Sequence, residues 1–472
     1  MLFNSYEFIF IFLPIVLLGY YNLAKYFSCN VAKYFLVLAS LAFYSYWDIR
    51  NLPVLLLSIA VNIGFGHWLN RNRSKWILAL GVGFNLCYLG YFKYVDFFIS
   101  NLNDFCGLSL PLQRIVLPLG ISFFTFTQTA YLVDVYRGET KEYRIADYLL
   151  FVTIFPHLIA GPILYHKDMI PQFMDKLRYR INYENMTYGI FWFTVGLFKK
   201  VVIADKLAVY ANKVFDAIGV IPMLDAWFGS LAYTLQLYFD FSGYSEMAIG
   251  LGLMLNFNLP WNFNYPYRAT SIIDFWRRWH ITLSQFLKDY LYIPLGGNRG
   301  GLAGHLRNIM ITMLLGGLWH GAGWTFVFWG GIHGLAICVN HLWRKTKIVL
   351  PKWFSWLLTF NVVNLAWIFF RAENFDKAMT IIRAMGDWST LSLYSERLAR
   401  YCSLFAIGNP NHIISAKACV GILLLIIVAI IKVKERKIEK FNWLVVGIVL
   451  GILFVVDLAN FGMESEFLYF QF

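Results

Sequence analysis

Nine histidines occur in the chain, and the surroundings of one of them suit acid–base chemistry. His320 lies in the run Gly316-Gly-Leu-Trp-His-Gly-Ala-Gly-Trp324, between two apolar stretches. An unperturbed imidazole titrates near neutral pH, so a neutral histidine can take a proton from a hydroxyl group. The glycines on both sides allow the backbone to approach a ligand closely. His320 is therefore a candidate general base, and a core histidine hydrogen-bonded across helices is the alternative.

A second histidine, His280, ends the run Trp276-Arg-Arg-Trp-His280. The guanidinium groups of Arg277 and Arg278 could bind a phosphate or a carboxylate in a fork geometry. If the run is helical, Ser284 lies on the same face as His280 because four residues separate them. The alternative is an interfacial basic helix anchored by its tryptophans.

Three further features could contribute to a site. The loop Pro294-Leu-Gly-Gly-Asn-Arg-Gly-Gly301 offers backbone amides and Arg299 as an anion cradle, although a flexible turn explains it as well. His333 could line the same cavity as His320, or mark a helix contact among small residues. Asp240 is an acid in an apolar stretch, which predicts an arginine partner, a helix cap or, less simply, a group that orients a histidine.

The composition places this chemistry in a membrane. Of 472 residues, 59% are hydrophobic and only 14% are charged, whereas an average soluble domain is about one quarter charged. This excludes a soluble globular domain, a disordered protein and a nucleic-acid-binding protein. The net charge of +13 is explained by basic cytoplasmic loops. No cysteine or histidine cluster has metal-binding spacing, and no nucleotide-binding motif fits, so we expect no metal and no bound cofactor.

The hydropathy pattern predicts an all-α polytopic membrane protein with about eleven to twelve membrane segments. The expected segments are Phe8–Tyr21, Tyr34–Trp47, Val54–Leu69, Trp76–Phe98, Ile115–Val135, Leu149–Tyr165, Met186–Ile203, Trp227–Leu255, Ile309–Leu318 running into Trp324–Leu342, Phe354–Phe370, Ala418–Ile431 and Trp443–Leu458.

Basic residues predict the orientation, because lysine and arginine gather on the cytoplasmic side. Three groups fall on one side of the first spans and place the N-terminus outside. They are Lys25 with Lys33, then Arg71, Arg73 and Lys75, then Arg137, Lys141 and Arg144. The basic run Lys432–Lys437 places the C-terminus outside as well. We take His166, beside Lys167, as solvated, and His305 and His341 as ordinary interfacial histidines.

Two segments do not fit a simple span. Leu149–Tyr165 is short, contains Pro156, Gly161 and Pro162, and has basic residues at both ends. These features predict a re-entrant segment, and a kinked span is the alternative. Ser271–Pro294 mixes charges with tryptophans at a density that would be costly in lipid. It predicts an amphipathic helix at the interface or packed inside the protein.

Seven motifs together resemble the membrane-bound O-acyltransferase (MBOAT) family, and most closely its bacterial alginate O-acetyltransferase-like membrane subunits. The resemblance runs over essentially the whole chain. The motifs are Pro118-Leu-Gly-Ile-Ser-Phe-Phe-Thr-Phe, Phe155-Pro-His-Leu-Ile-Ala-Gly-Pro-Ile163, Tyr238-Phe-Asp-Phe-Ser-Gly-Tyr244, Phe257-Asn-Leu-Pro-Trp-Asn-Phe-Asn-Tyr-Pro266, Phe275-Trp-Arg-Arg-Trp-His-Ile-Thr-Leu-Ser284, Tyr292-Ile-Pro-Leu-Gly-Gly-Asn298 and Gly317-Leu-Trp-His-Gly321.

The resemblance implies a single membrane domain over 1–472, with N-terminal helices in 1–135, a catalytic core in 136–345 and C-terminal helices in 346–472. It implies that His320 is catalytic and that His280 is the second catalytic position. Arg277, Arg278, Asn298 and Arg299 then become expected contacts for the acyl donor, acetyl-coenzyme A, which is a substrate and not a bound cofactor.

The resemblance also implies a cellular setting. The protein is expected in the bacterial cytoplasmic (inner) membrane, surrounded by the lipid bilayer, with acetyl-coenzyme A arriving from the cytoplasm. A periplasmic acetyltransferase or esterase-like partner would pass the acetyl group to a polysaccharide of the alginate type or to peptidoglycan. The alternatives are a transporter or flippase of an envelope precursor, D-alanyl transfer to teichoic acid, or a non-catalytic scaffold of a secretion complex.

Overall fold

The computed structural model of the chain describes residues 1–139, 144–391, 416–430 and 443–461, and every regular element within them is helical. The predicted all-α class is therefore confirmed. Six helical stretches are long and apolar enough to cross a membrane, which confirms a polytopic membrane protein. They are Phe8–Tyr26, Asn51–Arg71, Lys75–Cys106, Tyr183–Phe215, Trp324–Thr346 and Lys352–Arg371.

Fewer described helices meet this standard than the eleven to twelve segments predicted. Three of the expected segments are shorter apolar helices, Cys29–Ser45, Val420–Ala429 and Gly447–Ala459. Others are interrupted or start late: the helix expected from Ile115 begins only at Ile121. The basic run 432–437 and Lys141 lie outside the described residues.

The chain forms two compact units, and the first holds residues 1–198, 243–262 and 449–461. Its elements, with η for π- and 3-10-helical turns, are η1 (Phe8–Phe12), α1 (Leu13–Tyr26), α2 (Cys29–Ser45), α3 (Asn51–Arg71), α4 (Lys75–Leu89), η2 (Gly90–Tyr94), α5 (Val95–Cys106), α6 (Ile121–Arg137), α7 (Ile145–Thr153), α8 (Phe155–Leu158), α9 (His166–Met174), η3 (Lys176–Tyr179), α10 (Tyr183–Phe198) and the ends of α12 (Met223–Met254) and α21 (Trp443–Ala459).

The segment predicted to be re-entrant is broken and buried in this first unit. α7 ends at Thr153, α8 is a single turn with Pro156 at its start, and the chain then continues without a helix to Tyr165. Proline is tolerated in a first helical turn because its missing N–H would have no partner there. All residues from 150 to 166 are buried, and the re-entrant path itself stays a prediction.

Two charge assignments in this unit were wrong. Lys33 is not a loop residue, because it lies within α2, is 4% exposed and forms an ion pair with buried Asp147. His166 is not solvated, because it is 1% exposed and its Nδ1 lies 3.3 Å from a carboxylate oxygen of Asp134. The sequence did not reveal that Lys33 and His166 are buried, because their acidic partners Asp147 and Asp134 lie far away along the chain.

Of the described residues, the second unit holds 199–242, 263–391, 416–430 and 443–448. Its described elements are η4 (Lys199–Ala204), α11 (Asp205–Phe215), the first part of α12, η5 (Pro266–Arg268), α13 (Ile272–Trp276), α14 (Ile281–Leu287), η6 (Lys288–Tyr292), α15 (Gly301–His320), α16 (Trp324–Thr346), α17 (Lys352–Arg371), α18 (Phe375–Met385), η7 (Trp388–Leu391) and α20 (Ala416–Ile430).

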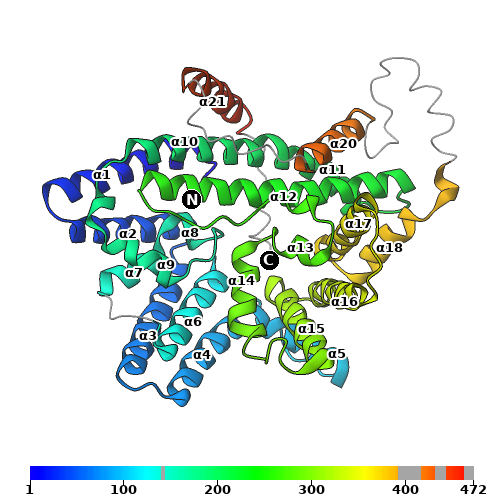
Figure 1. Cartoon of the computed structure of the whole chain (residues 1–472), viewed down its shortest axis with the longest axis horizontal. Helices are drawn as coiled ribbons and strands as arrows, with labels where there is room; N and C mark the ends of the chain where they lie inside the picture. The colour runs from blue at the N-terminus through cyan, green and yellow to red at the C-terminus, as the bar shows by residue number, and fades with distance from the viewer. Residues whose placement is uncertain (140–143, 392–415, 431–442, 462–472) are drawn as a thin grey trace. The chain divides into compact units, whose positions relative to one another are not determined.

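A tight hairpin of α15 and α16 positions the histidines of the second unit (Figure 1). A Cβ on Gly330 would collide with the carbonyl oxygen of Met313, and one on Gly317 would collide with that of Phe326. The two backbones therefore meet where glycines leave room, as is common between membrane helices. His320 ends α15, and His333 lies one turn beyond Gly330 on α16.

We expect Gly330→Ala to separate the two helices and to destabilise the protein by about 1–3 kcal/mol, the usual cost of overpacking. Gly331→Ala is the matched control, since its Cβ would meet only the Leu314 side chain at an ordinary 3.6 Å. Thermal unfolding in detergent compares the two variants. Equal melting temperatures for both would contradict the close packing of α15 on α16.

Candidate active site

His280 occupies a strained break between α13 and α14. Its backbone has φ 42° and ψ 56°, in the left-handed region that residues with a Cβ seldom adopt. The predicted single helix over Ser271–Pro294 was therefore wrong, because the chain turns at His280 and forms α13, α14 and η6 instead. Such backbone strain persists where surrounding packing determines it, and it concentrates at functional sites.

The His280 side chain is fully buried and packs edge-on against Phe241, with 4.7 Å between ring centroids. Burial lowers the pKa of the His280 imidazole to about 3. The ring is therefore neutral at physiological pH. A neutral imidazole has one N–H donor and one nitrogen acceptor, so His280 can hydrogen-bond to a bound substrate.

His320 ends α15 within a cage of aromatic rings and is 6% exposed. Its ring lies 4.8 Å from Trp319, 5.0 Å from Trp329 and 5.2 Å from Phe370 by centroid distance. The Trp319 ring is also 6.4 Å from that of His280. The rings of the two histidines that the sequence proposes as catalytic thus both lie near Trp319.

His333 belongs to the same aromatic cluster. It is completely buried, and its ring centroid lies 4.8 Å from that of Trp329. Its Nδ1 accepts a hydrogen bond of 3.3 Å from the indole N–H of Trp276. Trp329 contacts the rings of both His333 and His320. Neither histidine is among the residues that line the cavity described next, so a cavity shared by the two stays a prediction.

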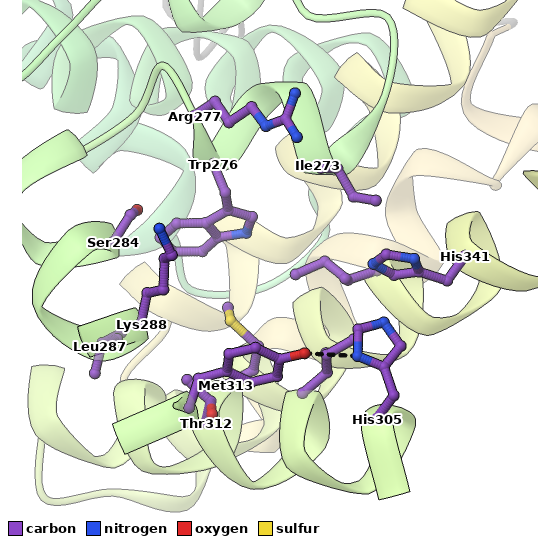
Figure 2. A pocket seen from close by; sticks show the side chains of 13 residues that line it. Ile273, Trp276, Arg277, Ser284, Leu287, Lys288, His305, Thr312, Met313 and His341 are labelled. Atoms are coloured by element: carbon purple, nitrogen blue, oxygen red, sulfur yellow. Dashed lines mark hydrogen bonds between the residues drawn. The ribbon is translucent and has the colours of Figure 1, made fainter. Parts of the chain in front are cut away.

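A cavity of about 370 Å³ opens beside this cluster, among α13, α14, η6, α15 and α16 (Figure 2). Four of its lining side chains are basic or can become so, and no acidic residue is among those described around it. Its lining residues are Ile273, Trp276, Arg277, Ser284, Leu287, Lys288, Tyr292, His305, Ile309, Thr312, Met313, Ile337 and His341. The cavity is therefore suited to a ligand that is partly apolar and negatively charged.

The predicted donor contacts divide between the cavity and its surroundings. Arg277 lines the cavity. Arg278 is not among the residues that line the cavity. Its Nε donates hydrogen bonds of 2.9 Å to both carboxylate oxygens of Asp274. Asn298 and Arg299 lie exposed on the loop before α15. Only one of the four predicted contacts therefore faces the cavity.

The sequence reading missed the polar end of the cavity farthest from Arg277. There a hydrogen bond of 2.6 Å joins the Tyr292 hydroxyl to Nδ1 of His305, and the His305 and His341 rings are 4.5 Å apart (Figure 2). The sequence alone predicts both only as ordinary interfacial histidines. His305 and His341 meet because α15 and α16 run antiparallel. The only sign of this contact in the sequence is that the two histidines lie 18 residues before and 18 residues after Gly323, in the turn between the helices.

Comparison with known proteins decides the family. The family model for MBOAT, the membrane-bound O-acyltransferase family, matches residues 10–375. The chain belongs to this family. The matched range includes both candidate histidines and the whole cavity, so this MBOAT protein is an O-acyltransferase embedded in a membrane.

Named relatives cover most of this MBOAT chain. A peptidoglycan O-acetyltransferase of Helicobacter pylori is 46% identical over 427 residues, which cover 83% of this chain and 81% of the relative. A probable alginate O-acetylase of Azotobacter vinelandii is 44% identical over 419 residues, 84% of this chain and 81% of the relative. A teichoic acid D-alanyltransferase of Bacillus subtilis is 27% identical over 315 residues, 62% and 79% of the two chains.

Asp240 has a partner other than the predicted arginine in this MBOAT protein. Lys200 places its Nζ 2.7 Å from an oxygen of Asp240 and 2.9 Å from one of Asp205, and all three side chains are at most 3% exposed. The triad lies within the second unit, and Phe241, the residue after Asp240, packs against the His280 ring. Its charges stabilise one another, and a contact that orients a histidine stays a prediction for Asp240.

The described residues contain no group of three or more histidine, cysteine, aspartate or glutamate side chains that could hold a metal ion.

Proposed function

We propose that this protein transfers an acetyl group from cytoplasmic acetyl-coenzyme A for the O-acetylation of a polysaccharide outside the cytoplasmic membrane. The observation that carries the proposal is His320, which ends α15 inside the aromatic cluster. Trp329 of this cluster contacts both His320 and Trp276, and Trp276 lines the basic cavity. The names of the two most similar relatives reported above favour an acetyl group and an envelope glycan, peptidoglycan or alginate.

In this proposal His320 is the general base. Its imidazole takes the proton of an acceptor hydroxyl as the hydroxyl oxygen attacks the thioester carbonyl carbon. The C–S bond then breaks, the ester is released, and the coenzyme thiolate recovers the proton from His320. Neutral His280 hydrogen-bonds to the acceptor hydroxyl and orients it. The 1–472 chain acts as one catalytic membrane domain.

The cavity is the proposed entrance of the donor. Arg277 and Lys288 would hold phosphate oxygens of the coenzyme, while Trp276, Leu287 and Met313 would contact its less polar arm. A guanidinium group binds phosphate well because its N–H groups match two oxygens. Arg278, Asn298 and Arg299 stay predicted contacts outside the cavity.

The acceptor side is proposed from the family resemblance. A serine of a periplasmic partner would receive the acetyl group and pass it to the polysaccharide, and both termini of this chain would be periplasmic. D-alanyl transfer to teichoic acid is the second candidate, favoured by the name of the more distant Bacillus relative. Mass spectrometry of esters on the exported glycans separates the two, because an acetyl ester and a D-alanyl ester differ in mass.

Arg277→Glu is expected to raise KM for acetyl-coenzyme A by about tenfold or more, since a charged hydrogen bond contributes about 1.5–3 kcal/mol. The turnover number is expected to change little, because Arg277 contacts no reacting atom. Kinetics in membrane vesicles over a range of donor concentrations measure both constants. Arg383→Glu, a charge reversal on the exposed face of α18, is the control. If the two variants had the same KM, the cavity would not be the donor site.

A further inference from the structure

Two buried side-chain nitrogens in the aromatic cluster that holds His320 have no hydrogen-bond partner among the residues that the structure describes. They are Nε1 of Trp329, a residue that is 1% exposed, and Nε2 of His333, which is fully buried. Native proteins pair nearly all buried polar groups, because an unpaired donor has lost its water without compensation. Two such donors in one aromatic cluster with the proposed general base are therefore candidates for hydrogen bonds to a substrate.

The hydrogen bond from Trp276 determines which nitrogen of His333 carries the proton. An indole N–H can only donate, so Nδ1 of His333 must be the acceptor in this bond. A neutral imidazole has a single N–H, which then belongs to Nε2. His333 is thereby held as a hydrogen-bond donor at the nitrogen that has no described partner.

The two donors share one face of one helix. Trp329 and His333 are four residues apart on α16, so their side chains are neighbours on the same side. The Trp329 ring lies 5.0 Å from His320 and 4.8 Å from His333 by centroid distance. The same face packs against Trp367 and Phe370 of α17, which holds the Trp329 ring in place.

We propose that Trp329 and His333 are catalytic residues that donate hydrogen bonds to the carbonyl oxygen of the acyl donor. This inference rests on the proposed function, acyl transfer with His320 as base. When the acceptor oxygen bonds to the carbonyl carbon, the electron pair of the C=O bond moves to the oxygen and creates an oxyanion. The hydroxyl proton goes to His320. The two N–H groups stabilise the oxyanion until the C=O bond forms again and the C–S bond breaks.

Packing alone does not explain the residue types. A phenyl ring in place of the Trp329 indole would keep an aromatic contact with His320, and an aliphatic side chain in place of His333 would avoid a buried polar atom. Donors that stand ready before the reaction need no reorganisation when charge develops, and this is the main source of oxyanion stabilisation in enzymes. Trp276, which lines the cavity and orients His333, connects the donor site with these groups.

The test compares Trp329→Phe, His333→Leu and His333→Gln in membrane vesicles supplied with acetyl-coenzyme A, by release of the coenzyme thiol. Trp329→Phe and His333→Leu are each expected to lower kcat by about 100- to 1,000-fold with KM for the donor nearly unchanged, the loss typical of one oxyanion donor. His333→Gln is expected to stay within about tenfold of wild type, because its amide can accept from Trp276 and still donate. Trp353→Phe, on an exposed part of α17, is the control.

Melting temperatures in detergent accompany the kinetics, so that a misfolded variant is recognised. Unchanged kcat in Trp329→Phe and His333→Leu would overturn the inference. So would a loss confined to KM, or a His333→Gln variant as inactive as His333→Leu. His320→Ala is measured in parallel to keep the two proposals apart. If this variant retains activity, His320 is not the base and the proposed function is wrong. If it is inactive while Trp329→Phe and His333→Leu keep their activity, only the proposal of the two oxyanion donors is wrong.

Discussion

His320→Ala is expected to lower the turnover number of acyl transfer by about 10²- to 10⁴-fold, the contribution of a positioned general base. Alanine cannot take the proton of the attacking hydroxyl. The free energy of the transition state therefore rises, while the binding of the substrates before the reaction is unaffected. KM for the donor is expected to change little, because His320 does not line the cavity. Initial rates with acetyl-coenzyme A in membrane vesicles, at matched protein levels, measure both constants.

His67→Ala is the control for this experiment, since His67 is exposed on α3 and should tolerate the same truncation. A thermal unfolding curve shows whether either variant is destabilised. Turnover of His320→Ala within a fewfold of wild type would show that another group takes the proton. In that case the aromatic cluster around His320 would be a structural core.

Lys200→Met is expected to destabilise the protein by about 3–5 kcal/mol, the cost of removing one partner from a buried ion pair. The change removes the cation that Asp205 and Asp240 share and leaves two buried carboxylates without it. A loss of this size is a large fraction of the unfolding free energy of a native protein, which is typically about 5–15 kcal/mol. The measurement is the yield of folded protein in detergent together with its melting temperature.

The neighbouring Lys206→Met provides a matched comparison, because Lys206 is exposed on α11. It should change stability by no more than about 0.5 kcal/mol, as is usual for a surface position. Equal yields and melting temperatures for the two methionine variants would mean that the triad contributes nothing to stability. Asp240 would then need another explanation.

The sequence was sufficient to predict those features that depend on composition and local motifs. The apolar content predicted a membrane protein, and the order of seven motifs predicted the family that the comparison confirmed. His320 stood out because an imidazole amid apolar residues is costly unless it has a use. His280 stood out because it follows Arg277 and Arg278 and lies in one of the family's motifs. The structure places both rings next to Trp319.

Features that depend on distant contacts were not predictable in this way. Nothing local shows that Lys200, forty residues before Asp240, is its partner, or that Lys33 pairs with Asp147. The break at His280 was missed because a left-handed histidine has no compositional sign, unlike a left-handed glycine. The cavity depends on how α15 is aligned against α16. Gly317 and Gly330 allow their close contact, but the sequence does not show that these two glycines face each other's helix.

The ester content of the exported polysaccharide tests the central claim most directly. Cells that produce either the wild-type protein or His320→Ala at equal membrane levels are compared by mass spectrometry of their purified peptidoglycan and secreted glycans. We predict acetyl esters on one of these glycans in wild-type cells and their loss in His320→Ala cells, with His67→Ala cells unchanged. Acetylation at the wild-type level in His320→Ala cells would contradict acyl transfer at His320.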